Sequence, residues 1–153
     1  MEYDIRGNLK PYDIIYTDWS TFRAEFVDAF PQSSTRQVIF RNFSEYIEKL
    51  VPIIGTGFHQ WIDGSFVTRK LDPRDIDIVT FVDASTYYAN EPEIDILRAY
   101  HRHHKTGVDE YFVKRHPETH RKHVFYEMDL FQWRNQFTTS RARKSKGFLQ
   151  LNF

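Results

Sequence analysis

The stretch of sequence that decides the fold is WIDGSFVTRKLDPRDIDIVTFV, residues 61–82. In its second half Asp75 and Asp77 alternate with Ile76 and Ile78, and successive side chains of a strand point to opposite faces. Both carboxylates therefore project from one face of a predicted strand, roughly 6.6 Å apart along it. Carboxylates at this separation can bracket two divalent ions, and two like charges beside an apolar strand are costly to desolvate without a cation between them. The alternation thus indicates a metal site.

A glycine-serine pair precedes this strand. Gly64 and Ser65 follow the end of another predicted strand, residues 58–62. A glycine lets backbone N–H groups approach a ligand, and a serine hydroxyl can donate a hydrogen bond to a phosphate oxygen. Lys70, further along the same connection, is a candidate partner for phosphate. The unit therefore combines a phosphate-binding turn with a pair of metal-binding carboxylates.

Two structural alternatives apply to the same residues. The Asp63-Gly64 dipeptide between apolar residues is a strong β-hairpin signal, and an Asp-x-Asp pair can lie on a solvated strand face. The hairpin is disfavoured because Pro73 interrupts the alternation, and a strand ladder tolerates proline poorly. The solvated face is disfavoured because Val79 and Phe81 share it with the aspartates.

The spacing of these residues resembles a known signature. Gly64-Ser65, residues 66–74 and then Asp75-Ile76-Asp77 look like the motif of the nucleotidyltransferase superfamily, which includes DNA polymerase beta and the minimal nucleotidyltransferases of bacterial conflict systems. More narrowly, residues 61–68, Lys70 and Pro73 resemble an uncharacterised bacterial family within that superfamily. The resemblance extends from about residue 30 to residue 148.

The resemblance implies an α/β nucleotidyltransferase fold and Mg²⁺-dependent transfer of a nucleotidyl group from a nucleoside triphosphate to a hydroxyl of an RNA or protein acceptor. Asp75 and Asp77 would hold Mg²⁺ or Mn²⁺, and Asp109 stands where the superfamily usually carries its third carboxylate. Glu110, on the opposite strand face, is the rival for that role. Two further aspartates fall on predicted helices and are weaker candidates: Asp95 and Asp129.

Composition bounds the remaining possibilities. A chain of 153 residues predicts one domain, residues 1–153, in which residues 1–16 form a peripheral segment. The 21 basic and 21 acidic side chains cancel, which argues against a protein that coats nucleic acid by bulk charge. The absence of cysteine excludes disulfides and thiolate catalysis and fits a reducing interior. The sequence contains neither an apolar leader nor a membrane-length apolar run, so we expect a cytoplasmic protein without a membrane partner.

Periodicity predicts helices over residues 18–30, 33–50, 90–107 and 123–137, and strands over residues 58–62, 75–82, 108–113 and 148–151. Thr17 or Ser20 is expected to cap the first helix, whereas Pro52 and Gly55 are expected to close the second. Residues 83–90 read as a polar connection. The order of elements favours a mixed β-sheet of about four or five strands backed by helices.

Two groups of charged residues invite a functional role. Two histidine clusters, at residues 101–104 and 116–123, match no closed zinc site, although one of these histidines is a candidate contact for substrate phosphate. Arg141 and Arg143 lie in a basic run that is either a solvated turn or a contact for acceptor phosphates.

Two other functions remain open. A binding module on the same fold, such as an antitoxin-like partner of a cognate protein in a toxin–antitoxin or phage-defence system, suits a short chain without an evident acceptor-binding domain. A metal-dependent nuclease also uses paired aspartates, but hydrolysis does not require a triphosphate-binding Gly-Ser turn. The sequence thus favours the transferase.

Overall fold

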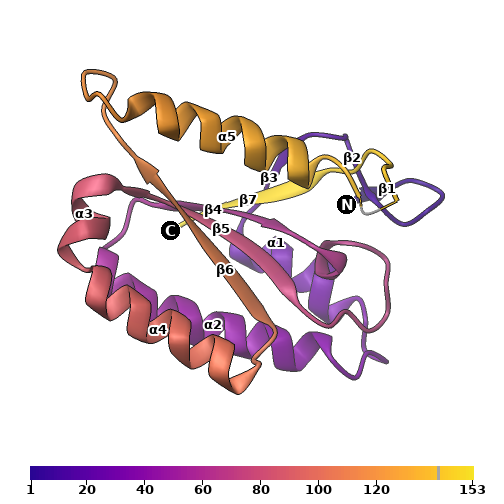
Figure 1. Ribbon diagram of the computed structural model, residues 1–153. Coiled ribbons are helices and arrows are strands. Elements are labelled where there is room, and N and C mark those ends of the chain that lie inside the picture. The colour runs from indigo at the N-terminus through magenta and orange to yellow at the C-terminus, as the bar shows by residue number, and fades with distance from the viewer. Residues whose placement is uncertain (141) are drawn as a thin grey trace.

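A five-stranded mixed sheet forms the centre of the computed structural model, which describes residues 1–140 and 142–153 (Figure 1). Its spatial order is β3-β7-β4-β5-β6. Strand β5 pairs antiparallel with β4 and parallel with β6, which confirms the predicted mixed α/β sheet. The strands are β3 (Ile14–Tyr16), β4 (His59–Asp63), β5 (Ile76–Asp83), β6 (Val108–Arg115) and β7 (Phe148–Asn152).

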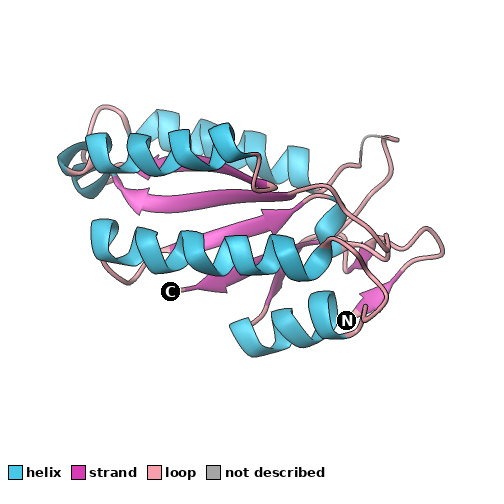
Figure 2. Ribbon diagram, turned by 90° about the horizontal axis from the view of Figure 1, so that it is seen from below, coloured by secondary structure: helices cyan, strands magenta, loops and turns pink. Residues whose placement is uncertain are grey.

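Helices cover both faces of this sheet. Helices α2 (Arg36–Ile54) and α4 (Glu91–His104) lie side by side on one face, which Figure 2 shows from their side. Helix α5 (His123–Phe137) lies on the opposite face, as Figure 1 shows, and has the bounds that periodicity predicts.

Side chains alternate between the two faces of β5, so this strand packs against the helices on both sides of the sheet. Ile76 and Ile78 join the larger apolar core, together with the buried side chains of α2 and α4. Val79 and Phe81 point the other way, into a smaller aromatic cluster beneath α5. Because side chains two positions apart share a face, Asp75 and Asp77 belong to the α5 side of the sheet.

The first predicted helix differs from the observed one. Helix α1 (Trp19–Arg23) passes directly into a π-helix, η1 (Ala24–Asp28). Its N-cap is Asp18, whose carboxylate accepts from the Thr21 N–H at 2.8 Å, so the prediction of Thr17 or Ser20 was wrong. A carboxylate is both a strong cap and the favoured charge at a helix N-terminus.

The end of α2 and the segment of residues 83–90 also differ from the prediction. Helix α2 continues through Pro52 to Ile54, because a proline in the last turn removes a single backbone donor, and it ends at Gly55 with φ +78°. The expected polar connection over residues 83–90 is a helix, α3 (Ala84–Ala89), which buries the Tyr87 ring against Phe112 at a centroid distance of 5.5 Å. Aromatic packing outweighs local polarity there.

The N-terminal segment, predicted to be peripheral, forms three short strands. Strands β1 (Glu2–Tyr3) and β2 (Leu9–Lys10) form a small antiparallel ribbon, and the Leu9 side chain is fully buried. Strand β3 then adds the edge of the main sheet by pairing parallel with β7. No helix of the described residues is long and apolar enough to cross a membrane.

Candidate functional site

A cavity of about 550 Å³ opens beside the start of β5 and β6. The C-terminal end of α5 and the segment that precedes β7 complete its wall. The cavity is lined by all six residues that the sequence predicts for the site: Gly64, Ser65, Lys70, Asp75, Asp77 and Asp109. Residues separated by up to 45 positions in the sequence are thus brought to one place by the pairing of the strands.

The carboxylates lie on adjacent strands. Asp77 and Asp109 are direct partners across the parallel pair, where neighbouring strands stand about 4.8 Å apart. Burial, and then the neighbouring Asp75 carboxylate, raise the pKa of Asp109 above its ordinary value. Burial, and then Asp109, Asp77, Glu110 and Asp75, raise the pKa of Tyr111. The cavity therefore concentrates negative charge that a cation would relieve.

The rival carboxylate has another role. Glu110 faces the opposite side of β6, where its carboxylate pairs with the Arg98 guanidinium at 3.3 Å and its side chain is 7% exposed. Asp95 lies on α4 within 3.7 Å of the same arginine, and Asp129 lies on α5; neither lines the cavity. Among the candidate third carboxylates, Asp109 is the one that the fold brings to Asp75 and Asp77.

Gly64 connects the turn to the carboxylates. Its φ of +87° and ψ of −171° fall in a region that is almost restricted to glycine, and a Cβ at this position would overlap the Asp77 carboxylate. Strands β4 and β5 do pair antiparallel, but residues 64–75, including the 3₁₀ turn η2 (Ser65–Val67), separate them in place of a two-residue hairpin turn. The close approach fixes the Gly-Ser turn against the acidic strand.

A buried arginine anchors the same connection. The Arg36 guanidinium donates to five backbone carbonyls at 2.5–3.2 Å, and four of them belong to residues 66–71. Burial lowers its pKa to about 10. The sequence analysis missed this residue, although its position, three before Ile39 and seven before Phe43, places it on the apolar stripe of α2. A charged residue in line with an apolar stripe is the sequence signal that could have identified Arg36 as a buried anchor.

An ion pair lies in the wall of the cavity. The Lys146 ammonium donates to the Asp63 carboxylate at 2.5 Å, and Asp63 is 3% exposed. Within the described residues the second carboxylate oxygen, Oδ1, is buried and accepts no hydrogen bond. Burial raises the pKa of Asp63 to about 7, while Lys146 opposes the shift and Asp77 adds to it. No local sequence pattern links the two residues, which lie 83 positions apart.

The remaining charged candidates lie elsewhere. Arg143 is exposed and does not line the cavity, and Arg141 lies outside the described residues. In the first histidine cluster, His101 is buried on α4, bonded through Nδ1 to the Thr106 hydroxyl at 2.7 Å and packed edge-on against Tyr46. His101 therefore stabilises the helical layer. The basic run extends to Lys146, and within its described part Lys146 is the residue that lines the cavity.

The donor set determines which metal fits. The described residues contain no ready-made group of three or more histidine, aspartate or glutamate side chains that could hold a metal ion. Mg²⁺ does not require one, because it usually binds through one or two carboxylates, waters and substrate phosphates. Asp75, Asp77 and Asp109 offer hard oxygen ligands of this kind. They fit an ion that arrives with a phosphorylated substrate better than a resident structural ion.

The geometry defines a mixed α/β protein whose carboxylate-lined cavity adjoins a Gly-Ser turn. The chain belongs to DUF6932, a family of unknown function whose model matches residues 1–152. Comparisons with curated proteins and with solved structures found no match.

Proposed function

We propose that the protein is a nucleotidyltransferase with the corresponding fold, which uses Mg²⁺ or Mn²⁺ to move a nucleotidyl group from a nucleoside triphosphate to a hydroxyl of an RNA or protein acceptor. The observation that carries the proposal is the meeting of the Gly64-Ser65 turn with Asp75, Asp77 and Asp109 in one cavity. A hydrolytic metal site would explain the carboxylates but not the turn that is fixed against them.

Each residue has a role that follows from its position. The backbone at Gly64 and the Ser65 hydroxyl hold the triphosphate, and Lys70 at the rim contributes a positive charge. Asp75 and Asp77 would hold the ion that accompanies the triphosphate. When bound, the metal would neutralise the triphosphate and the leaving pyrophosphate.

Asp109 completes the set on the neighbouring strand. With Asp75 and Asp77 it would help to hold the metal, and it would accept the proton of the attacking hydroxyl.

The experiment that tests the proposal follows an α-labelled triphosphate into product. The protein is incubated with each nucleoside triphosphate, Mg²⁺ and a mixture of RNA and protein acceptors, and the labelled acceptor is resolved on a gel. We expect Asp77→Asn to abolish labelling, and Asp109→Asn to abolish it while leaving triphosphate binding largely intact.

Glu110→Gln is the matched control, because this side chain lies next to Asp109 in sequence but on the opposite strand face, paired with Arg98. It should retain transfer. The opposite ranking of the Asp109 and Glu110 variants would reject the assigned roles. Labelling that survives all three substitutions would reject the site.

A second candidate function is a non-catalytic binding module with a cognate protein partner. Exposed apolar side chains on the outer side of α5 favour it: Val124, Phe125, Met128 and Phe131. In that case the triphosphate would bind without any labelled acceptor appearing, and the protein partner would bind equally to wild type and Asp77→Asn. For either function we propose a cytoplasmic setting in a toxin–antitoxin or phage-defence system, on the strength of the sequence resemblance.

A further inference from the structure

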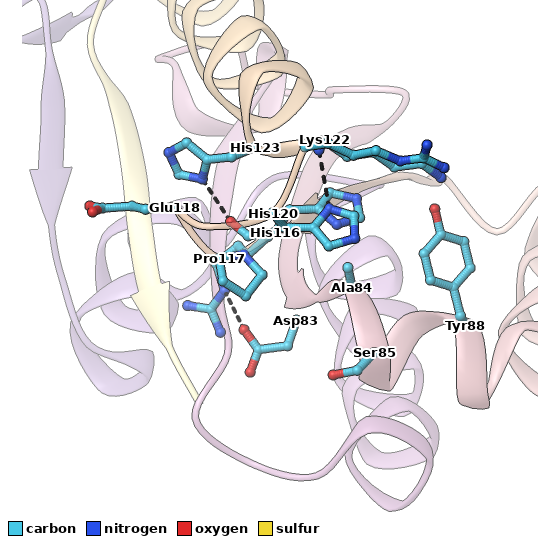
Figure 3. Close-up of a pocket in the computed structure, with 12 residues that line it drawn as sticks. Asp83, Ala84, Ser85, Tyr88, His116, Pro117, Glu118, His120, Lys122 and His123 are labelled. Carbon is cyan, nitrogen blue, oxygen red and sulfur yellow. Dashed lines mark hydrogen bonds and ion pairs between the residues drawn. The ribbon is translucent and has the colours of Figure 1, made fainter.

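A second cavity, of about 910 Å³, lies at the opposite end of β5 and β6 (Figure 3). It is built from the last residue of β5, helix α3, the end of β6 and residues 116–123. Asp77 and Asp83 are six positions apart on β5, which places them about 20 Å apart along the strand. Whatever binds here does not share the carboxylate site.

The wall of this second cavity is rich in cationic and imidazole groups. Asp83, one of its two acidic residues, pairs with the Arg115 guanidinium at 3.3 Å. The other, Glu118, points away from the histidine pair in Figure 3. The side chains that give the wall its character are Arg121, Lys122, His116, His120 and His123. The local balance is positive although the chain as a whole is neutral.

Two of the histidines form an ordered pair. The rings of His116 and His120 stack at a centroid distance of 4.8 Å and an interplanar angle of 16°. The backbone N–H of Lys122 donates to His120 Nδ1 at 3.1 Å, so the proton of a neutral His120 ring resides on Nε2. Burial, followed by His120 and Lys122, lowers the pKa of His116. The group thus presents a ring N–H donor in a field that disfavours further positive charge and favours an anion.

An aromatic ring stands beside these cations. Tyr88 is 46% exposed, and its ring centroid lies 6.4 Å from that of His116. The ammonium groups of Lys114 and Lys122 lie over this ring, 4.9 Å and 5.7 Å from its centroid. Proteins that bind single-stranded nucleic acid combine aromatic rings, on which bases stack, with cationic side chains that contact the phosphates.

We propose that this cavity binds a nucleotide, with its phosphate between His120 and Lys122 and its base against Tyr88. The nucleotide is either free or part of a single-stranded RNA, since both present the same phosphate and base. This inference does not depend on the proposed transferase activity, because it concerns different residues at the other end of the strands.

Binding is tested by titrating the full chain with inorganic phosphate, with adenosine monophosphate and with a short fluorescein-labelled single-stranded RNA. EDTA is present throughout, so that no metal-dependent binding at the carboxylates contributes. Lys122→Ala should weaken binding of adenosine monophosphate about tenfold, because it removes a charge-assisted contact. Tyr88→Leu should weaken the monophosphate several-fold and leave inorganic phosphate unchanged, because it removes only the stacking surface.

Arg41→Ala is the matched control, since it removes an exposed cation from α2, away from the cavity. His120→Asn provides a second variant if Lys122→Ala does not fold, and thermal melting verifies each protein. If the RNA binds more tightly than the monophosphate, with a steep salt dependence, the ligand is a nucleotide within RNA. Equal affinities would identify the free nucleotide as the ligand. Either result supports the site. Absence of saturable binding for all three probes, or equal losses in the Lys122 and Arg41 variants, would overturn it.

Discussion

Strands β5 and β6 run parallel and side by side, yet their two ends carry opposite chemistry. At their starts, Asp77 and Asp109 stand opposite each other in a cavity lined by four carboxylates and three cationic side chains. At their ends, Asp83 and Arg115 stand opposite each other and form an ion pair at the edge of a histidine-rich cavity. The same strand pair thus carries two facing carboxylates at one end and a carboxylate–guanidinium pair beside clustered histidines at the other.

The two ends also differ in how they are held. The acidic end adjoins a connection that Arg36, fully buried, fixes through five backbone carbonyls. At the histidine-rich end Arg115, whose side chain is 29% exposed, forms a single ion pair with Asp83. A site that must hold several groups in a fixed geometry needs the first kind of support. The comparison indicates that buried hydrogen bonds hold the connection at the acidic end, whereas a partly exposed ion pair joins the two strands at the other end.

The largest effect is expected from a substitution that removes hydrogen bonds of Arg36. Arg36→Lys leaves a buried ammonium with too few donors for five carbonyls, so the free energy of unfolding should fall by about 2–4 kcal/mol. Arg115→Lys, the matched change at the other end, should cost less than about 1 kcal/mol. Urea denaturation measures both. Equal losses would show that the two ends are supported alike.

An intermediate effect is expected at Gly64. Gly64→Ala should reduce the free energy of unfolding by about 2–3 kcal/mol, through backbone strain and overlap with the Asp77 carboxylate, and should weaken triphosphate binding in Mg²⁺. Gly55→Ala is the control, because Gly55 has a similar φ of +78° and ψ of −166° but nothing within 4 Å of an added Cβ. It should show the strain alone, about 1–2 kcal/mol, and normal binding. Normal triphosphate binding in both variants would show that the Gly64-Ser65 turn has only a structural role.

The smallest effect concerns pH. Burial raises the pKa of Asp63 from 3.8 to about 7, so the folded protein binds this proton more tightly than the unfolded chain. The resulting stabilisation is complete below about pH 4 and is lost as the pH rises through 7. Urea denaturation between pH 6 and pH 8 should show Asp63→Asn gaining about 1 kcal/mol relative to wild type as the pH increases. Parallel curves for the two proteins would contradict the buried, proton-binding carboxylate.

The acidic end could be predicted from the sequence because its geometry is local. Alternation along residues 75–82 determines which side chains share a face, and the helical return to residues 108–113 makes a parallel neighbour natural. The structure accordingly brings Asp109 beside Asp77 and turns Glu110 away. Chemical roles for these residues stay predictions that the labelling experiment tests.

The remainder of both sites depends on contacts between distant segments. The Lys146–Asp63 pair joins residues 83 positions apart, and no periodicity signals it. Helix α3 forms part of the second cavity, but the sequence predicts a polar connection there. The helix is stabilised by packing of Tyr87 against Phe112, a tertiary contact that the local sequence does not indicate. Arg36 was detectable as a charge on an apolar stripe, but its five acceptors lie on η1 and on the connection between β4 and β5.

The most direct test of the central claim is a crystal structure of the protein with Mn²⁺ and a non-hydrolysable triphosphate, with the metal located by anomalous scattering. The account predicts anomalous density within coordination distance of the Asp75 and Asp77 carboxylates, and phosphate density against the Gly64-Ser65 turn. Soaking Asp77→Asn crystals under the same conditions should remove the metal peak. A metal bound at His116 and His120 instead, or a triphosphate bound away from the turn with the carboxylates vacant, would contradict the assignment of the acidic end as the nucleotide-metal site.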